Sequence, residues 1–371
     1  MTEDQLIAGL SAWVEIESPT YDAKGVDAMM DLVANEAATA GVAVERIAGR
    51  DGLGGHLVLR AGRARDEGAN LVLSHLDTVH PLGTIERDLM LRREGDKLFG
   101  PGIYDMKGGA YLAFRAFLAA ARAGEAKRPL AFLFTSDEEI GSPTSRDLIE
   151  QHGRRAAAVL VTEPARDGGR CVTARKGVGR FEVEIEGRPS HAGSRHPDGR
   201  SAIREAAHQI LAIECLTDYE RGVTTSVGMI SGGTAVNVIP QHAHLSVDLR
   251  VVTADDGTEY TRRILGLAPV GHDVAVRVSG GMNRPPYERS EAIGHLFDRA
   301  RDLAAEIGQT LEETVRTGGG SDGNFTAALG TPTLDGLGVD GDGAHTLHEH
   351  ALVSCLVPRL ALMERLLTRL A

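Results

Sequence analysis

Cysteine is scarce in this chain of 371 residues, which contains three: Cys171, Cys215 and Cys355. They lie far apart and form no CxxC pair, which excludes a disulfide framework and predicts reduced, mostly buried thiols in a reducing compartment. Long apolar runs are absent as well, since none approaches the roughly 18 residues of a membrane span. The N-terminal stretch is an acidic amphipathic segment without a basic or apolar signal region. We therefore expect a soluble cytoplasmic protein.

Positive charge is also in short supply, because 40 Lys and Arg residues face 52 Asp and Glu residues and leave a net charge of −12. Nucleic acids and anionic membranes are bound through basic patches, whereas the arginines here are scattered along the chain. We therefore exclude both as main partners and expect a small molecule or a protein. The apolar share of 42% and the charged share of 25% are ordinary for a globular protein, and the length suits two domains.

Short apolar runs alternate with helical stretches between residues 55 and 163. The runs are "HLVLRAG", "LVLSH", "LAFLFTS" and "AVLVTEP", and "GGAYLAFRAFLAAARAG" is typical of the helical stretches. This alternation predicts an α/β fold with a mixed, mostly parallel sheet between helices. Open sheets of this kind hold their sites beyond the carboxyl ends of the strands, so the residues that follow each run are candidates for a site.

A different pattern begins near residue 178, where "RFEVEIEG" alternates apolar and polar residues. Helices are expected in "SAIREAAHQILAIECL" and "GTEYTRRILGLA", and strands in "TTSVGMISGG", "AHLSVDLRVV" and "VAVRVSGG". Together they predict a βαββαβ unit, an α+β domain over 178–288 that is inserted into a discontinuous α/β domain over 1–177 and 289–371. After the insertion we expect a helix near 291–307, a strand in "TPTLDGLG" and a closing helix interrupted by Pro358.

Three carboxylates stand side by side at the end of one predicted strand: Asp137, Glu138 and Glu139 in "FTSDEEIGS". Neighbouring like charges repel and raise one another's pKa, so such a cluster requires a group that neutralises it. Bound cations are the interpretation that fits the rest of the sequence.

Other predicted strand ends carry ligand-type side chains too. His75 and Asp77 in "SHLDTVHP" are two positions apart and point the same way on an extended backbone, which suits a metal ligand and the group that orients it. Asp105 in "GPGIYDMKGG" stands at the start of a helix, and Glu163 in "VTEPA" follows another strand. Each also has an ordinary interpretation: a solvated loop for the first pair, a helix N-cap for Asp105 and an exposed acid for Glu163.

The segment "GAHTLHEHA" adds His345, His348 and His350 late in the chain, where a polar loop is the alternative. The metal hypothesis rests on convergence, because several strand ends of one sheet deliver a His or a carboxylate. Nitrogen and oxygen ligands without thiolate suit Zn²⁺, Co²⁺ or Mn²⁺. A carboxylate that bridges two ions about 3.5–4 Å apart would explain why the site needs so many anions.

Seven segments resemble the motifs of the M20 metallopeptidase family in their order and spacing: "SHLDTV", "GPGIYDMKGG", "TSDEEIGS", "TEPA", "RPSHAG", "GGGSD" and "GAHTLHE". This family includes glutamate carboxypeptidases, aminoacylases, acetylornithine deacetylase and succinyl-diaminopimelate desuccinylase. The resemblance extends over nearly the whole chain. It implies two divalent metal ions per chain, most simply Zn²⁺, and a set of five ligands: His75, Asp105, Glu139, Glu163 and His345.

Within this implied set, Asp105 would bridge the two ions. His75 and Glu163 would complete one site, and Glu139 and His345 the other. The histidine at 345 is preferred over its neighbour at 348 because the family pattern is a His followed four residues later by an acid.

The same resemblance implies further roles near the metals. Asp77 would orient His75, and Glu138 would act as the general base. Because neighbouring side chains on an irregular loop diverge, Glu138 can face a water while Glu139 binds metal.

In the inserted domain, which the resemblance implies is a lid and dimerisation domain, His191 in "RPSHAG" is similar to a histidine that reaches the partner subunit's site and stabilises an oxyanion. The alternative is an ordinary turn histidine. Asn237 and Arg250 resemble lid residues that contact substrate, and Arg284 in "NRPPY" resembles an arginine that grips a substrate carboxylate. An exposed hinge arginine without contacts is the alternative for Arg284.

The glycine run before Ser321 has no P-loop lysine, so we interpret Gly320 and Ser321 as a place of close backbone approach to substrate. No role is assigned to Arg170, Arg175 or Lys176, which leaves the side-chain specificity open.

The leading hypothesis is a homodimeric two-metal amidohydrolase that cleaves an amide or peptide bond next to a free carboxylate, in an N-acyl amino acid or a short peptide. One rival is hydrolysis of an unusual amide or aryl amine on the same scaffold. The other is a non-catalytic metal or amino-acid binding protein, which the presence of Glu138 disfavours.

Overall fold

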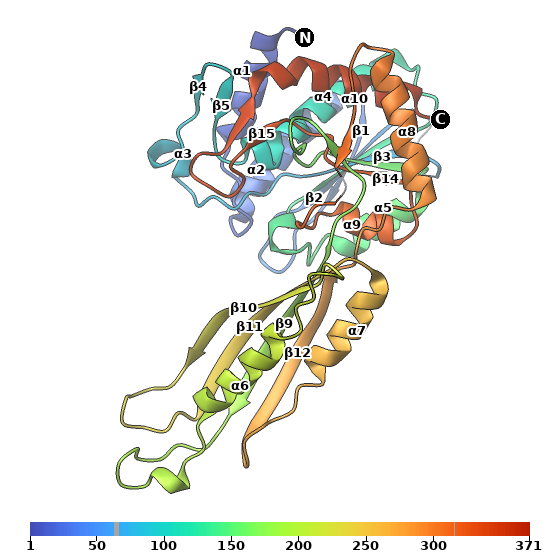
Figure 1. Cartoon of the computed structure of the whole chain (residues 1–371). Helices are drawn as coiled ribbons and strands as arrows, with labels where there is room; N and C mark the ends of the chain where they lie inside the picture. The colour runs from blue at the N-terminus through green and yellow to red at the C-terminus, as the bar shows by residue number, and fades with distance from the viewer. Residues whose placement is uncertain (63–66, 315) are drawn as a thin grey trace. The chain divides into compact units, whose positions relative to one another are not determined.

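The computed structural model describes residues 1–62, 67–314 and 316–371, and the chain divides into two compact units (Figure 1). The first unit comprises Met1–Ala174, Arg289–Thr317 and Ser321–Ala371. The second comprises Arg175–Glu288 and Gly318–Gly320.

The first unit is built on a six-stranded sheet with the order β1-β2-β6-β3-β7-β14. Its inner pairs, β3 with β6, β3 with β7 and β7 with β14, are parallel, whereas β1 and β2 join antiparallel at one edge. The strands are β1 (Ala43–Ile47), β2 (His56–Ala61), β3 (Asn70–His75), β6 (Leu130–Thr135), β7 (Ala158–Val161) and β14 (Thr333–Leu334). The predicted mixed, mostly parallel sheet is confirmed.

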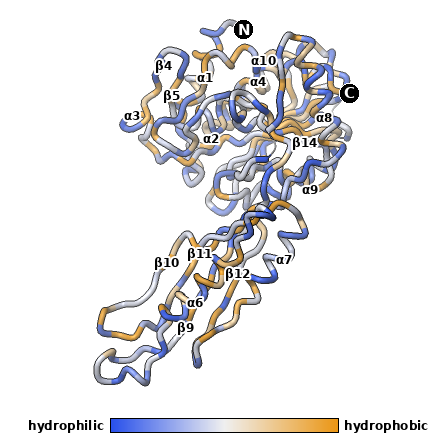
Figure 2. Tube along the Cα trace, viewed as in Figure 1, coloured by the Kyte–Doolittle hydropathy of each residue, from blue (hydrophilic) through white to orange (hydrophobic). Residues whose placement is uncertain are grey.

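Both faces of this sheet are covered by helices, which is why β2, β3, β6 and β7 read as apolar runs (Figure 2). Neighbouring residues point to opposite faces: Leu57 joins one buried core and Val58 the other. The helices of the larger core are α1 (Glu3–Val14), α2 (Ala23–Thr39), α4 (Gly108–Ala123), α8 (Glu291–Ala305) and α10 (Leu356–Arg369). The helices of the smaller core are α5 (Arg146–Arg155) and α9 (Gly323–Ala328).

Local sequence fixes where these helices begin and end. Thr2 and Gln5 form a capping box at the start of α1, and Gly124 ends α4 in a left-handed conformation with φ of 67°. At the other end of α4, a Cβ on Gly109 would lie 2.1 Å from the carbonyl oxygen of Thr162. Glycine therefore lets the start of α4 approach the end of β7, which brings Asp105 and Glu163 to the same edge of the sheet.

Smaller elements surround this sheet. A four-stranded sheet has the order β15-β16-β5-β4, and β13 pairs with β8. The strands are β4 (Arg92–Glu94), β5 (Lys97–Phe99), β8 (Cys171–Val172), β13 (Glu313–Thr314), β15 (Gly341–Asp342) and β16 (His350–Leu352). The short helices are α3 (Thr84–Arg87), η1 (Ile103–Lys107), η2 (Glu138–Ile140) and η4 (Val353–Cys355).

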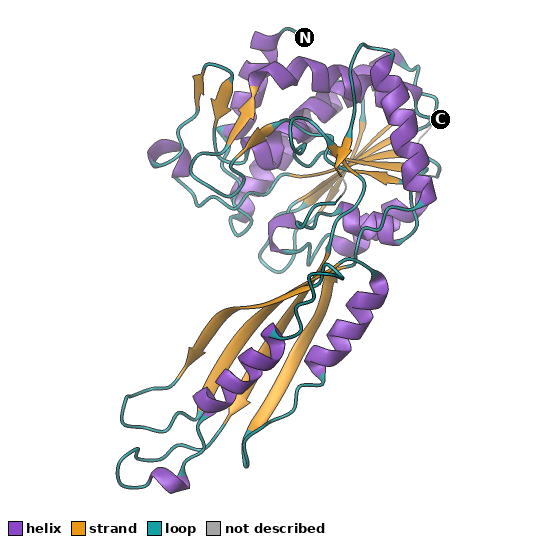
Figure 3. Ribbon diagram, viewed as in Figure 1, coloured by secondary structure: helices purple, strands orange, loops and turns teal. Residues whose placement is uncertain are grey.

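The second unit is an antiparallel sheet, β10-β11-β9-β12, with two helices packed on one face (Figure 3). Its elements are β9 (Gly177–Glu186), η3 (His196–Asp198), α6 (Ala202–Glu214), β10 (Thr224–Gly232), β11 (His242–Val251), α7 (Ala254–Leu265) and β12 (Ala275–Arg284). This chain order confirms the predicted βαββαβ unit. Phe181, Val183 and Ile185 face the helices while the intervening residues are exposed or half-buried, which accounts for the alternating pattern of β9.

Three local predictions differ from the structure. Pro358 lies in the first turn of α10 and does not interrupt it, because the N–H that proline lacks has no partner in a first turn. The strand expected in "TPTLDGLG" is confined to Thr333–Leu334. Of the three thiols, Cys171 is buried, but Cys355 is half-buried and Cys215 is exposed.

Among the described residues, no helix combines the length and apolar character that crossing a membrane requires.

Candidate metal centre

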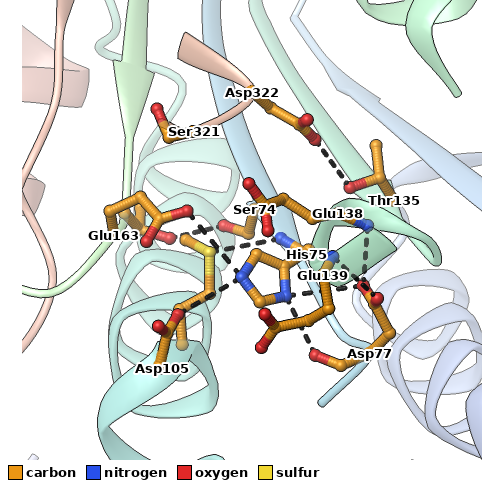
Figure 4. Close-up of polar contacts among 12 residues, drawn as sticks. Ser74, His75, Asp77, Asp105, Thr135, Glu138, Glu139, Glu163, Ser321 and Asp322 are labelled. Atoms are coloured by element: carbon orange, nitrogen blue, oxygen red, sulfur yellow. Dashed lines mark hydrogen bonds and ion pairs between the residues drawn. The ribbon is translucent and has the colours of Figure 1, made fainter. Parts of the chain in front are cut away.

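Seven residues that the sequence singled out come from separate segments of the first unit and meet at the carboxyl edge of its sheet. Figure 4 labels all of them except His345. They are His75 at the end of β3, Asp77 beyond it, Asp105 in η1, Glu138 and Glu139 in η2 after β6, Glu163 after β7, and His345 before β16. The helix that was expected to begin at Asp105 starts later, at Gly108, so Asp105 is not its N-cap. Nor is Glu163 an exposed acid, since its side chain is buried.

The ring of His75 has a defined proton position. Its Nδ1 lies 2.9 Å from the backbone carbonyl of Asp77, and because a carbonyl oxygen only accepts, Nδ1 donates the hydrogen. In the neutral ring the lone pair is then on Nε2, which is buried and has no hydrogen-bond partner in the described part of the chain. This arrangement prepares Nε2 as a metal ligand, and it is the Asp77 carbonyl that fixes the ring.

The carboxylate of Asp105 faces two histidines with its two oxygens. Oδ1 lies 3.4 Å from His75 Nε2, and Oδ2 lies 3.5 Å from His345 Nε2. Each histidine has a second carboxylate nearby: Glu163 Oε1 at 3.7 Å from His75 Nε2, and Glu139 Oε2 at 3.2 Å from His345 Nε2. Two sets of nitrogen and oxygen atoms therefore share Asp105.

The carboxylate of Asp77 organises the acidic loop. Oδ1 accepts a hydrogen bond from the N–H of Glu138 and Oδ2 one from the N–H of Glu139, both at 3.2 Å. The hydroxyl of Thr20 donates to the same carboxylate at 2.7 Å. Asp77 thus holds the backbone of the loop in place while its own carbonyl orients His75.

The third acid of the cluster has a different task. Asp137 is fully buried, and its carboxylate accepts hydrogen bonds from the backbone N–H and the hydroxyl of both Thr144 and Ser145. We predicted that cations neutralise all three carboxylates. For Asp137 that prediction is wrong, because hydrogen bonds within the protein satisfy it.

Without cations, protons occupy this centre. Hydrogen bonds to Asp105 and Glu139 raise the pKa of His345 to about 11, and burial raises the pKa of Glu139 to about 8. Burial opposes the ionised form of Asp105 too, but its interactions with His345 and His75 outweigh that effect and hold its pKa below the usual range. A cation must therefore displace protons when it binds.

The donor set fits divalent cations. Two groups have ligand atoms within 4.8 Å of one another: His75, Asp105 and Glu139, and His75, Glu138 and Glu163. Besides His75 Nε2, Glu139 Oε1 is buried without a hydrogen-bond partner in the described part of the chain. Buried polar atoms left unpaired are costly unless a ligand completes them, and an all nitrogen and oxygen set suits Zn²⁺, Co²⁺ or Mn²⁺.

Comparison with known proteins decides the family. The profile described as peptidase family M20/M25/M40 matches residues 71–369. Carboxypeptidase G2 of Pseudomonas sp. is 31% identical over 375 residues, which cover 99% of this chain and 90% of that protein. The chain belongs to peptidase family M20/M25/M40. It is therefore a hydrolase of amide or peptide bonds.

Other members of the M20 family extend the comparison. Succinyl-diaminopimelate desuccinylase of Acinetobacter baumannii is 29% identical, with 75% of this chain and 76% of that protein covered. The YXEP protein of Bacillus subtilis, whose structure is described as a dinuclear metal-binding peptidase of the M20 family, has a TM-score of 0.69 at 14% identity. That match covers 99% of this chain and 96% of the YXEP chain, and it shows that the fold is shared.

The substrate residues expected in the second unit form two groups. Near one end of its sheet, the backbones of His191 and Val238 form an isolated antiparallel β-bridge. The N–H of Ala192 donates to the carbonyl of Asn237 at 2.9 Å. The ring of His191 is exposed, and its Nδ1 accepts from the N–H groups of Gly193 and Ser194. The neutral ring therefore carries its hydrogen on Nε2, which makes Nε2 a hydrogen-bond donor.

The other group lies at the opposite end of the sheet. Arg250 on β11 and Arg284 on β12 pair with Val178 of β9 from its two sides. The guanidinium of Arg250 donates to both carboxylate oxygens of Asp248, at 2.8 and 2.9 Å. Arg284 is buried, so the alternative of an exposed arginine is excluded. A Cβ on Gly320 would lie 2.8 Å from Cδ of Arg284, so only glycine fits at this position.

The hydroxyl of Ser321 is committed within the first unit, whereas the prediction for this position concerns the approach of its backbone to substrate. The hydroxyl is fully buried, donates to Asp335 Oδ2 at 2.6 Å and accepts from the N–H of Gly323. Of the residues without an assigned role, Arg170 pairs with Glu312 at the surface, while Arg175 is buried in the second unit.

Sequence reasoning missed several polar residues that support the centre. The hydroxyl of Thr20, in "ESPTYD", comes from 57 positions before its partner Asp77, and no local pattern indicates it. Glu349 was noted only as the acid that identifies His345. Its fixed spacing of four residues from His345 was a signal in the sequence that this acid has a role near the centre.

Proposed function

We propose that this M20 enzyme is a two-metal amidohydrolase that cleaves an amide or peptide bond next to a free carboxylate. The observation that carries the proposal is the division of the Asp105 carboxylate between His75 and His345. A carboxylate that serves two ions is the feature expected of a dinuclear hydrolase site, and one ion would leave half of this donor set without a role.

Five residues would hold the ions. His75 and Glu163 would bind one ion with Oδ1 of Asp105, and Glu139 and His345 would bind the other with Oδ2. When bound, the ions would polarise the scissile carbonyl and lower the pKa of water, which Zn²⁺, Co²⁺ and Mn²⁺ all do.

Glu138 would perform the proton transfers. Its carboxylate lies with His75 and Glu163 at the centre, and its backbone N–H is held by Asp77. In this position it would take a proton from the attacking water and later deliver that proton to the leaving amine.

Residues of the second unit would recognise the substrate. The Nε2 hydrogen of His191 is the donor that would stabilise negative charge on the carbonyl oxygen, supplied across a homodimer, and Asn237 would contact the same carbonyl. Arg284 would bind the substrate carboxylate. The guanidinium of Arg250 donates to Asp248, so a role of Arg250 in binding substrate would require it to share that guanidinium.

Removing the ions should abolish activity. After treatment with a chelator, hydrolysis of N-acyl amino acids and dipeptides, followed through the released amino acid, should fall to background and return with Zn²⁺, Co²⁺ or Mn²⁺. Metal analysis of the active protein should approach about two ions per chain. A fully active apoprotein, or a protein that never takes up metal, would refute the two-metal proposal.

Arg284 should set the preference for a free carboxylate. Arg284→Lys loses the bidentate guanidinium geometry, so kcat/KM on acid substrates should fall about 10–100-fold, while the rate on the matching amides stays low and unchanged. Arg277→Ala is the control on the same strand, because Arg277 is exposed and pairs with Glu186. Equal wild-type rates on acids and amides would instead favour hydrolysis of an unusual amide or aryl amine.

A further inference from the structure

The carboxylate of Glu349 is one of the most completely bonded groups of the first unit. The residue is 1% exposed. Oε1 accepts hydrogen bonds from the N–H groups of Tyr104 and Asp105, both at 2.9 Å. Oε2 accepts from the N–H of Gly102 at 2.9 Å and from Nε2 of His80 at 2.7 Å.

These four bonds join three segments that carry the ligand-type residues of the candidate centre. His80 lies beyond His75 and Asp77, the three backbone N–H groups belong to the loop of Asp105, and Glu349 itself follows His345. The partners are 244 to 269 positions from Glu349 in the chain.

We propose that Glu349 is a positioning residue that sets the distance between Asp105 and His345 and thereby the geometry of the two-ion centre. This inference rests on the proposed function. Glu349 points its oxygens at the backbone of the Asp105 loop, so it acts on the ions through that loop and touches neither substrate nor the reacting atoms.

The pocket suits a carboxylate better than an amide. All four partners are donors, so the group they surround must accept through both of its oxygens. A Gln at position 349 keeps one acceptor but turns its amide NH₂ toward N–H donors, and two or more of the four bonds are lost. The loop of Asp105 then loses its fixed distance from His345, although the side chain has the same size.

The test is Co²⁺ binding to the chelator-treated protein, followed by calorimetry and by the visible absorption of bound Co²⁺. Glu349→Gln should weaken at least one Co²⁺ about 10–100-fold, the range typical of residues that orient metal ligands. The Co²⁺ spectrum should change as well, because the spectrum reports ligand geometry, which a loss of fold stability alone does not alter in the folded protein.

Glu17→Gln is the matched control. Glu17 also accepts two backbone N–H bonds in the first unit, from Gly83 at 2.7 Å and Ile85 at 3.0 Å, but neither bond reaches the loop of Asp105 or the segment of His345. Its Co²⁺ affinities and spectrum should equal those of the wild type. His80→Ala removes one of the four bonds to Glu349, so it should shift the spectrum in the same direction as Glu349→Gln but to a smaller extent.

The outcomes separate the two proposals. If folded Glu349→Gln has the Co²⁺ affinities and spectrum of the wild type, the role of Glu349 is overturned and the proposed function stands. If that variant does not fold, the same result in His80→Ala leads to the same conclusion. A lowered melting temperature of the apoprotein with an unchanged Co²⁺ spectrum also overturns it, since Glu349 is then a structural residue only. A wild-type protein that binds no Co²⁺ overturns both.

Discussion

Replacing Glu138 by Gln should lower kcat by ~10²–10⁴-fold while the protein keeps its metal, because the change removes a proton-transfer group and leaves its size and surroundings intact. Metal content should be measured on the same samples as kcat, and binding of a non-hydrolysed substrate analogue should persist. The result is informative because Glu138 and Glu139 are adjacent and each belongs to one of the two candidate ligand groups.

The neighbours of Glu138 provide matched controls. Glu139→Gln should weaken metal binding itself, since Glu139 faces His345 at 3.2 Å and has a buried oxygen without a partner in the described part of the chain. Asp137→Asn should lower the melting temperature of the apoprotein, because Asp137 is bonded to Thr144 and Ser145. If Glu138→Gln and Glu139→Gln lost metal to the same extent, the division of roles between them would be wrong.

His191→Ala should lower kcat by about 10²–10³-fold, the effect of removing one donor to a developing oxyanion. Binding of metal should not change, because His191 belongs to the second unit and the five proposed ligands to the first. His196→Ala is the control, since His196 is an exposed histidine of the same loop region. Unchanged kcat in His191→Ala would make His191 an ordinary turn residue.

Subunit exchange then tests whether His191 acts across a dimer. Inactive His191→Ala and inactive Glu138→Gln chains should, when mixed, form heterodimers with one site that combines Glu138 of one chain with His191 of the other. Activity should return toward about a quarter of the wild-type level at full random exchange of an isologous dimer. If exchange is verified with tagged chains and no activity returns, His191 does not act in trans.

Local sequence was sufficient for most of the fold. The apolar runs at β2, β3, β6 and β7 predicted a sheet covered on both sides, and the alternation in β9 predicted a half-exposed strand, because side-chain periodicity reports burial directly. The predictions that were wrong concerned the extent of single helices and strands. The extent of α10 around Pro358 depends on which turn of the helix the proline occupies, and periodicity does not determine that.

The candidate centre was predictable to the level of residue types at strand ends. Because parallel strands end at one edge of a sheet, His75, Glu139 and Glu163 could be expected to meet, and the structure brings them together with Asp105 and His345. The partners of Asp137, Thr144 and Ser145, could not be predicted, since Asp137 and Glu138 are adjacent and of the same chemical class.

The sequence by itself determined most helices and strands, the polar residues that follow the strands, and membership of the M20 family. These features depend on neighbouring residues and on the spacing of motifs. Only the tertiary structure decided that Asp137 turns away to Thr144 and Ser145, and that the two oxygens of Asp105 face different histidines. It also decided that Glu349 binds the loop of Asp105, 244 positions away. The physical reason is that a buried carboxylate takes its role from the donors that surround it, and those donors come from distant parts of the chain.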